Sequence, residues 1–197
     1  IEGRMKRPEY VATIVHVYRK AIDHHFDAQS MQVDDIDRDH LAQVFNRDFT
    51  TAYMEKHQGR HMMSDRRPNN RGLLIGRVTA YDRNARRVSV KLTRNLAVGD
   101  QVDFWVKVGG RVSAEIEHLY DARGRACIEA GAGDVVSFPI RGKVHMNDRV
   151  FKVYDARLME AAQRSYDAEH SFRIPLHAAL YARCGEKLRL SMEDDAG

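Results

Sequence analysis

The chain has 197 residues, of which 43% are hydrophobic and 30% charged, the balance of an ordinary soluble globular protein. No run approaches the roughly 18 consecutive apolar residues of a membrane span, so a transmembrane protein is excluded. Two cysteines, thirteen glycines and four prolines exclude disulfide-rich, collagen-like and low-complexity classes, and the net charge of +4 permits a polyanionic partner without requiring one.

The N-terminal region predicts two helices. The four residues from Ile1 to Arg4 form the recognition sequence of a processing protease used to remove fusion tags, and are expected to be a tag remnant. Residues 6–26 predict a helix, and acidic residues followed by apolar ones predict a second helix over residues 35–46. Residues 50–70 are polar and predict no regular element. The apolar stripe of the first helix comprises Val11, Ile14, Val15, Tyr18 and Ile22.

From Gly72 the hydrophobic pattern alternates with a period of two. Short alternating segments with turn residues about every 8–12 positions indicate a small sandwich or barrel. We favour a closed barrel because closure removes exposed sheet edges. The barrel is expected to end at Tyr154, with inward-facing side chains at Val90, Val102, Phe104, Val106, Ile116, Phe138 and Ile140.

The C-terminal region predicts a short helix over residues 156–166 and a β-hairpin that turns at Gly185. An isolated hairpin is marginally stable, so it either extends the barrel or begins a further domain. The fold class is therefore α+β and mainly β: two helices, a small closed β-barrel, then a helix and a β-hairpin. The expected divisions are residues 5–66 for the helical segment and linker, 67–154 for the barrel and 155–197 for the helix and hairpin.

Short segments along the chain resemble, in the right order, motifs of the collagenase-like peptidases, peptidase family U32. KRPEYVA (residues 6–12) and YRKA (18–21) resemble the end of the catalytic domain, and VFNRDFTT (44–51) resembles the motif before an accessory barrel. RPNNRG (67–72) with IGRV (75–78) resembles the barrel's entry, and DRVFKV (148–153) its exit. The resemblance extends from Lys6 to Asp194, although Asp48 stands where the family more often has glycine.

The resemblance implies that the chain is the C-terminal part of a larger cytoplasmic protein. It would begin at the last helix of a TIM-like catalytic domain and continue into an accessory barrel that resembles the second domain of translation elongation factors. Some relatives resemble RNA-modifying, hydroxylating enzymes whose iron–sulfur cluster is held by four cysteines of the catalytic domain. Those cysteines would not be in this chain, so no cofactor is expected here.

Neither a catalytic set nor a metal-binding set is recognised in the sequence. His57 and His61 have i, i+4 spacing, but Gly59 argues against a helix and no acidic residue completes a zinc motif. Cys127 and Cys184 are interpreted as a small core residue and a semi-exposed thiol. The chain has no Gly-x-Ser-x-Gly motif.

The strongest local signal is basic. Residues 66–94 carry nine cations and one acid, Asp82, which gives +8 in a chain of +4. Eight of the nine are arginines, whose planar fork suits phosphate and carboxylate groups. The alternative is that alternating strands simply place these cations outward, where they protect sheet edges. The candidate contacts to a polyanion or substrate are Arg66, Arg67, Arg71, Arg83, Arg86 and Arg87.

Trp105 is the second signal, because it alternates out of phase with Phe104 and Val106. A tryptophan on a polar face could stack on a nucleobase or a proline ring. The interpretation we favour is packing against a neighbouring helix, for which the stripe of residues 11–22 is the candidate. We nevertheless keep Trp105 among the candidate contacts.

Two classes of function stay open. The first is a non-catalytic accessory domain of a collagenase-like peptidase, which would position a collagen-like protein substrate or stabilise the catalytic barrel. The second is an RNA-binding module of an RNA-modifying relative, with structured RNA as the partner. In both, the chain would contact its own catalytic domain, interact with no membrane and lack peptidase activity by itself.

Overall fold

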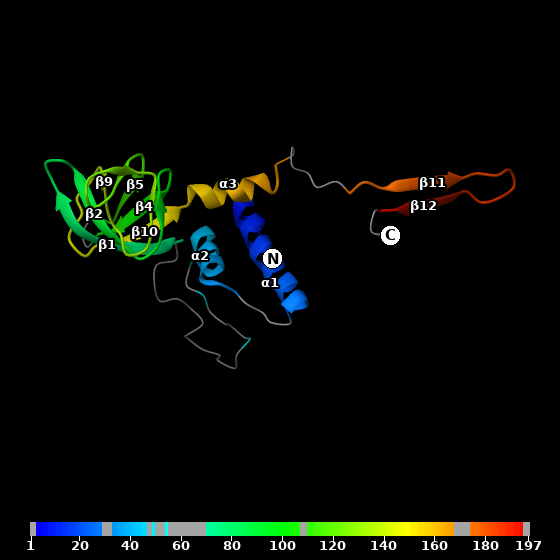
Figure 1. Ribbon diagram of the computed structural model, residues 1–197, viewed down its shortest axis with the longest axis horizontal. Helices are drawn as coiled ribbons and strands as arrows, with labels where there is room; N and C mark the ends of the chain where they lie inside the picture. The colour runs from blue at the N-terminus through cyan, green and yellow to red at the C-terminus, as the bar shows by residue number, and fades with distance from the viewer. Residues whose placement is uncertain are drawn as a thin grey trace.

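The structure, a computed structural model, describes residues 3–28, 33–46, 49, 54, 70–106, 110–167 and 174–194. A curled β-sheet lies at one end, a β-hairpin at the other, and helices between them (Figure 1). The elements are α1 (Pro8–Ala28), α2 (Asp35–Val44), β1 (Leu73–Asp82), β2 (Arg87–Leu92), β3 (Leu96–Ala97), β4 (Gln101–Trp105), β5 (Arg111–Glu115), β6 (Leu119–Tyr120), β7 (Ala126–Cys127), β8 (Glu129–Ala130), β9 (Val135–Pro139), β10 (Arg149–Tyr154), α3 (Ala156–Arg164), β11 (His177–Tyr181) and β12 (Arg189–Glu193).

The main sheet has eight antiparallel strands in the order β5-β4-β10-β1-β2-β9-β6-β7, and β3 pairs separately with β8. A mostly-β α+β fold is therefore confirmed. Closure of the barrel is not, because the ladder of the described strands stays open between β5 and β7. A Cβ added at Gly142 would lie 2.6 Å from Cγ1 of Val112, so an irregular segment packs against β5 in place of a further strand.

The core lies on the concave side of the curled sheet. Alternation places Val102 and Phe104 of β4 inward, and both are fully buried. Six of the seven predicted inward residues are buried in this core, and the seventh, Val106, is half-buried against it. The core residues are Ile75, Val78, Val88, Val90, Leu92, Leu96, Val102, Phe104, Ile116, Leu119, Val136, Phe138, Ile140, Val144 and Val150.

The three predicted helices are present, and α1 contacts both α2 and α3. The predicted apolar stripe of α1 is only partly covered, and the buried positions of the helix are Thr13 and Val17. Val15, Tyr18 and Ile22 are 46%, 58% and 42% exposed. The apolar side of α1 is thus turned away from most of its neighbours within the described residues.

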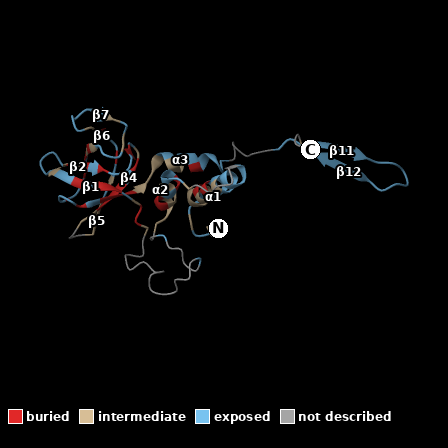
Figure 2. Ribbon diagram, turned by 60° about the horizontal axis from the view of Figure 1, so that its bottom comes forward, coloured by how far each residue is buried: buried red, intermediate tan, exposed pale blue. Residues whose placement is uncertain are grey.

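The predicted C-terminal hairpin is formed by β11 and β12. Every residue of its two strands is exposed, as the pale blue colour in Figure 2 shows. In the described part of the chain the two strands pair only with each other. Whether the hairpin extends the barrel or begins another domain stays a prediction.

Candidate nucleic-acid interface

The arginines predicted as polyanion contacts do not form one surface. Arg66 and Arg67 lie outside the described residues. Arg71 is only 4% exposed, so it is not part of an exposed cationic surface. Arg83 and Arg86 are exposed in the turn after β1, at the opposite end of that strand from Arg71.

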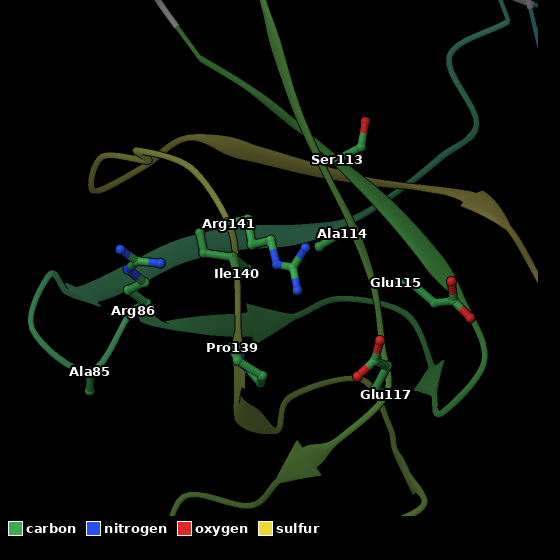
Figure 3. A pocket seen from close by; sticks show the side chains of 9 residues that line it. All are labelled: Ala85, Arg86, Ser113, Ala114, Glu115, Glu117, Pro139, Ile140 and Arg141. Carbon is green, nitrogen blue, oxygen red and sulfur yellow. The ribbon is translucent and has the colours of Figure 1, made fainter.

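Arg86 lines a cavity of about 530 Å³ between β5 and the segment that follows β9 (Figure 3). Arg141 also lines this cavity, together with Glu115 and Glu117. Two cations and two carboxylates leave the cavity without net charge. It is therefore a poor phosphate pocket, and Arg86 does not extend a cationic surface there.

Arg87 lies on a different part of the sheet. It is the first residue of β2, and its guanidinium carbon is 4.3 Å from the centroid of the Tyr120 ring on β6. This distance is a cation–π contact. The contact ties Arg87 of β2 to Tyr120 of β6. Arg87 is half-buried.

Trp105 lies on the outer face of the sheet. Its neighbour Phe104 points into the core, so alternation along β4 places the indole outside. In the strand register Trp105 is opposite Arg149 of β10 on one side and Arg111 of β5 on the other. The ring is half-buried, which leaves part of it accessible.

The contacts of Trp105 form a compact cluster. The ring of Phe151, which is buried, lies 4.6 Å from the Trp105 ring, centroid to centroid, with a 31° angle between the planes. The guanidinium carbon of Arg149 is 5.0 Å from the Trp105 centroid, and that of Arg111 is 5.5 Å away. These ring contacts of Trp105 are to β5 and β10, and the packing on α1 favoured from the sequence is not among them.

A buried carboxylate holds Arg111 in position. Asp103 lies two residues before Trp105 on β4, on the same face of the strand. Its carboxylate accepts from Nη1 of Arg111 at 3.1 Å and from Oγ of Ser113 at 2.6 Å. Asp103 is 6% exposed, so this ion pair is well shielded from water. It fixes one guanidinium beside Trp105, while Arg149 is exposed and has no ion pair with a described carboxylate.

The strand register extends this cluster into a line of cations. Arg77 of β1 lies opposite Arg149, and Lys91 of β2 lies opposite Arg77. We call this set the cationic row: Lys91, Arg77, Arg149 and Arg111, with Trp105 between the last two. It crosses the outer face of five adjacent strands, roughly 19 Å along the sheet at the usual strand spacing.

Sequence reasoning did not find this row as a unit. Lys91 and Arg77 belong to the basic segment, but Arg111 and Arg149 lie 17 or more positions beyond its end at residue 94. The sequence does contain one signal for the row. Each of its residues is next to a core residue in its strand, so alternation places it on the face opposite the core. Bringing them together needs the pairing of β10 with β1 and β4, which is a long-range property.

Comparison with known proteins agrees with the family resemblance. The model of Peptidase family U32 matches residues 1–64. The predicted resemblance to family U32 is confirmed. A curated relative, tRNA hydroxylation protein P1 of Bacillus subtilis (strain 168), is 29% identical over 156 residues, which are 77% of this chain; the chain spans 37% of that protein's length.

Two solved structures of a C-terminal domain assigned to the U32 peptidases of Geobacillus thermoleovorans are also similar. The first has a TM-score of 0.39 and 21% identity, and covers 41% of this chain and 91% of the solved one. The second is its selenomethionine variant, with the same TM-score and identity. It covers 40% of this chain and 98% of the solved one. The likeness to a translation elongation factor domain stays a prediction.

The described part of this U32-like chain contains no group of three or more His, Cys, Asp or Glu side chains placed to hold a metal ion. His57 and His61 lie outside it. Burial, followed by the nearby Asp121 and Asp134, raises the pKa of the Cys127 thiol, whereas reactive cysteines have lowered values. No described helix has the length and hydropathy that a membrane span requires.

One buried charge cluster was not anticipated from the sequence. Lys152 is 1% exposed, and its Nζ lies 2.6 Å from Oδ2 of Asp155 and 3.4 Å from Oδ2 of Asp100. Asp100 also accepts from the backbone N–H of Ala156, and Asp155 from that of Leu158, which caps α3. The cluster therefore joins β10 to α3, and its charges are satisfied internally.

Proposed function

We propose that the chain is a non-catalytic accessory module that binds RNA for a larger, cytoplasmic RNA-modifying protein of the U32 type. The observation that carries the proposal is the cationic row. Lys91, Arg77 and Arg149 lie directly opposite one another on neighbouring strands. Like charges in such positions destabilise a sheet, so stability alone does not account for them.

A polyanion would relieve this repulsion. Each arginine of the row can contact a phosphate through two N–H groups, and binding would release counterions from the RNA. The row carries four cations against the single carboxylate of Asp103, which is already paired with Arg111. The name of the curated relative, a tRNA hydroxylation protein, supports RNA as the polyanion.

The test is binding of the chain to a labelled transfer RNA at low salt. Arg77→Ala and Arg149→Ala are each expected to weaken binding several-fold, whereas Arg123→Ala is the matched control. Arg123 is an exposed arginine in the turn between β6 and β7, away from the row. Undetectable binding, or equal loss in all three variants, would contradict the proposal.

The second candidate is an accessory domain of a peptidase, for which the match to the peptidase family model is the supporting observation. The apolar side of α1 would then contact the catalytic domain of the same protein, since Tyr18 and Phe26 are 58% and 76% exposed. This candidate predicts binding to gelatin without cleavage. Gelatin binding that survives Arg149→Ala, together with no RNA binding, would favour it.

A further inference from the structure

We infer that the Trp105 end of the cationic row binds an unpaired nucleotide of single-stranded RNA, by stacking of its base on the Arg149–Trp105 platform. This inference rests on the proposed function and names the class of RNA that the row takes. It differs from the expectation of a long RNA helix that the basic segment alone suggests.

The first argument is the clustering of planar groups. The Trp105 and Phe151 rings are 4.6 Å apart, and the Arg149 guanidinium carbon lies 5.0 Å from the Trp105 centroid and 5.9 Å from the Phe151 centroid, so the three groups form a triangle with Arg149 beside both rings. Arg149 is the exposed member of the three. Nucleobases stack on aromatic rings and on arginine planes alike, so the accessible side of this cluster offers planar groups on which a base can stack.

The second argument is that the platform is held ready. Phe151 is 7% exposed and packs against the indole, while the Asp103 carboxylate fixes Arg111 beside it. Arg111 is therefore committed to its ion pair, which leaves Arg149 as the planar group that faces solvent. A preorganised platform loses little conformational entropy when a base is added.

The third argument is the shape of the surface. The sheet curls around its core (Figure 1), and the row's residues alternate with core residues, so the row lies on the convex face opposite the core, across β2, β1, β10, β4 and β5. A rigid duplex would touch a convex surface over a short arc, whereas a flexible single strand can follow it. The faces of paired bases are covered by their neighbours, and only an unpaired base offers a face to Trp105.

These arguments give each residue a separate task. Arg77 and Lys91 continue the row across β1 and β2 and would contact the phosphates on one side of the stacked base. Arg149 and Trp105 would contact the base itself. Loss of charge should therefore weaken all RNA, and loss of the plane should weaken single strands alone.

The experiment uses a labelled pyrimidine-rich RNA oligonucleotide, alone and annealed to its complement, with the full chain. Because Trp105 is the chain's one tryptophan, its fluorescence reports stacking without any label on the protein. We expect the single strand to quench that fluorescence and to bind at least tenfold more tightly than the duplex. Arg149→Lys, which keeps the charge and removes the plane, should weaken the single strand by roughly 5- to 150-fold, the value of one base stack, and leave the duplex unchanged.

Trp105→Phe tests the platform independently, since it keeps a ring and the fold is checked by its melting temperature. It should weaken the single strand and not the duplex, and Arg123→Lys should change neither. Equal binding of both RNAs without quenching would overturn this inference and leave the proposed function standing. Failure of both RNAs to bind would overturn the proposed function itself.

Discussion

Arg149 on β10 and Arg77 on β1 lie directly opposite each other on the outer face of the sheet. Both are exposed, and neither forms an ion pair with a described carboxylate. Their side chains differ in what they contact, because Nη1 of Arg77 donates to the carbonyl oxygen of Asn147 at 3.0 Å, whereas Arg149 lies on Trp105. Two like charges therefore face each other across neighbouring strands, an arrangement that destabilises a sheet.

The cost of this repulsion can be measured at the end of the row. Lys91→Glu places a carboxylate opposite Arg77 and should raise the free energy of unfolding by about 0.2–1 kcal/mol, the value of an opposite-charge cross-strand pair. The same variant should weaken RNA binding, because a phosphate contact becomes repulsive. Urea unfolding and RNA titration measure the two effects.

The control for this variant is Lys143→Glu, the same charge change at an exposed position outside the strands. Its stability should stay within about 0.5 kcal/mol of wild type, as for most surface changes. A Lys91→Glu protein that is less stable and binds RNA as before would show that the row is an ordinary surface.

The core assignment predicts a large effect at Phe104. This ring is fully buried and packs 6.1 Å from the ring of Phe138, centroid to centroid. Phe104→Ala should lower the free energy of unfolding by about 3–5 kcal/mol. Leu74→Ala, at an outer position that is 42% exposed, is the control, and a loss below about 1 kcal/mol for Phe104→Ala would show the strand phase to be wrong.

The buried cluster around Lys152 predicts a dependence on acid pH. Burial alone would raise the pKa of Asp155, but Lys152 and the N–H of Leu158 outweigh it and hold that pKa below its ordinary value of 3.8. The stabilisation by the Asp155 carboxylate is therefore present above pH 3.8 and is lost as the pH falls through the lower, folded-state pKa. Asp100 opposes this trend, since burial raises its pKa despite the lysine.

Asp155→Asn isolates the contribution of the Asp155 charge, because the amide oxygen can still cap α3. At neutral pH the variant should be less stable by about 1.5–3 kcal/mol, the value of a hydrogen bond to a charged group. Below pH 3.8 the difference from wild type should shrink. Unfolding curves over the acid range measure it, and a difference that does not change with pH would mean that the Lys152 contact contributes no charge effect.

Much of the curled sheet could be predicted because alternation is a local signal. Val102 and Phe104 are inward by their spacing alone, and both are buried. Alternation does not reveal closure, which depends on the short strands β6 and β7 and on the segment beside Val112. The exposure of Tyr18 has a related explanation, since a helical period shows which residues share a face and not which face is covered.

The candidate interface could be predicted only in part. Trp105 was recognised as an outward aromatic residue, but its partners Arg149 and Arg111 come from strands that lie 44 and 6 positions away in sequence. Clustering along the sequence drew attention to Arg71 instead, which is buried. When neighbouring strands are distant in the chain, residues that are charged and close in sequence need not share a surface, and a charged surface need not come from one segment.

The most direct test of the account is the salt dependence of RNA affinity in two double variants. Arg77→Ala/Lys91→Ala removes the two cations of the row that are assigned to phosphates, and Arg83→Ala/Arg86→Ala removes two from the exposed turn after β1. For the first, the slope of log affinity against log salt should fall by about two, one for each lost phosphate contact; for the second, it should stay unchanged. Equal slopes in the wild type and the row variant, or a loss confined to the turn variant, would contradict the assignment of RNA binding to the cationic row.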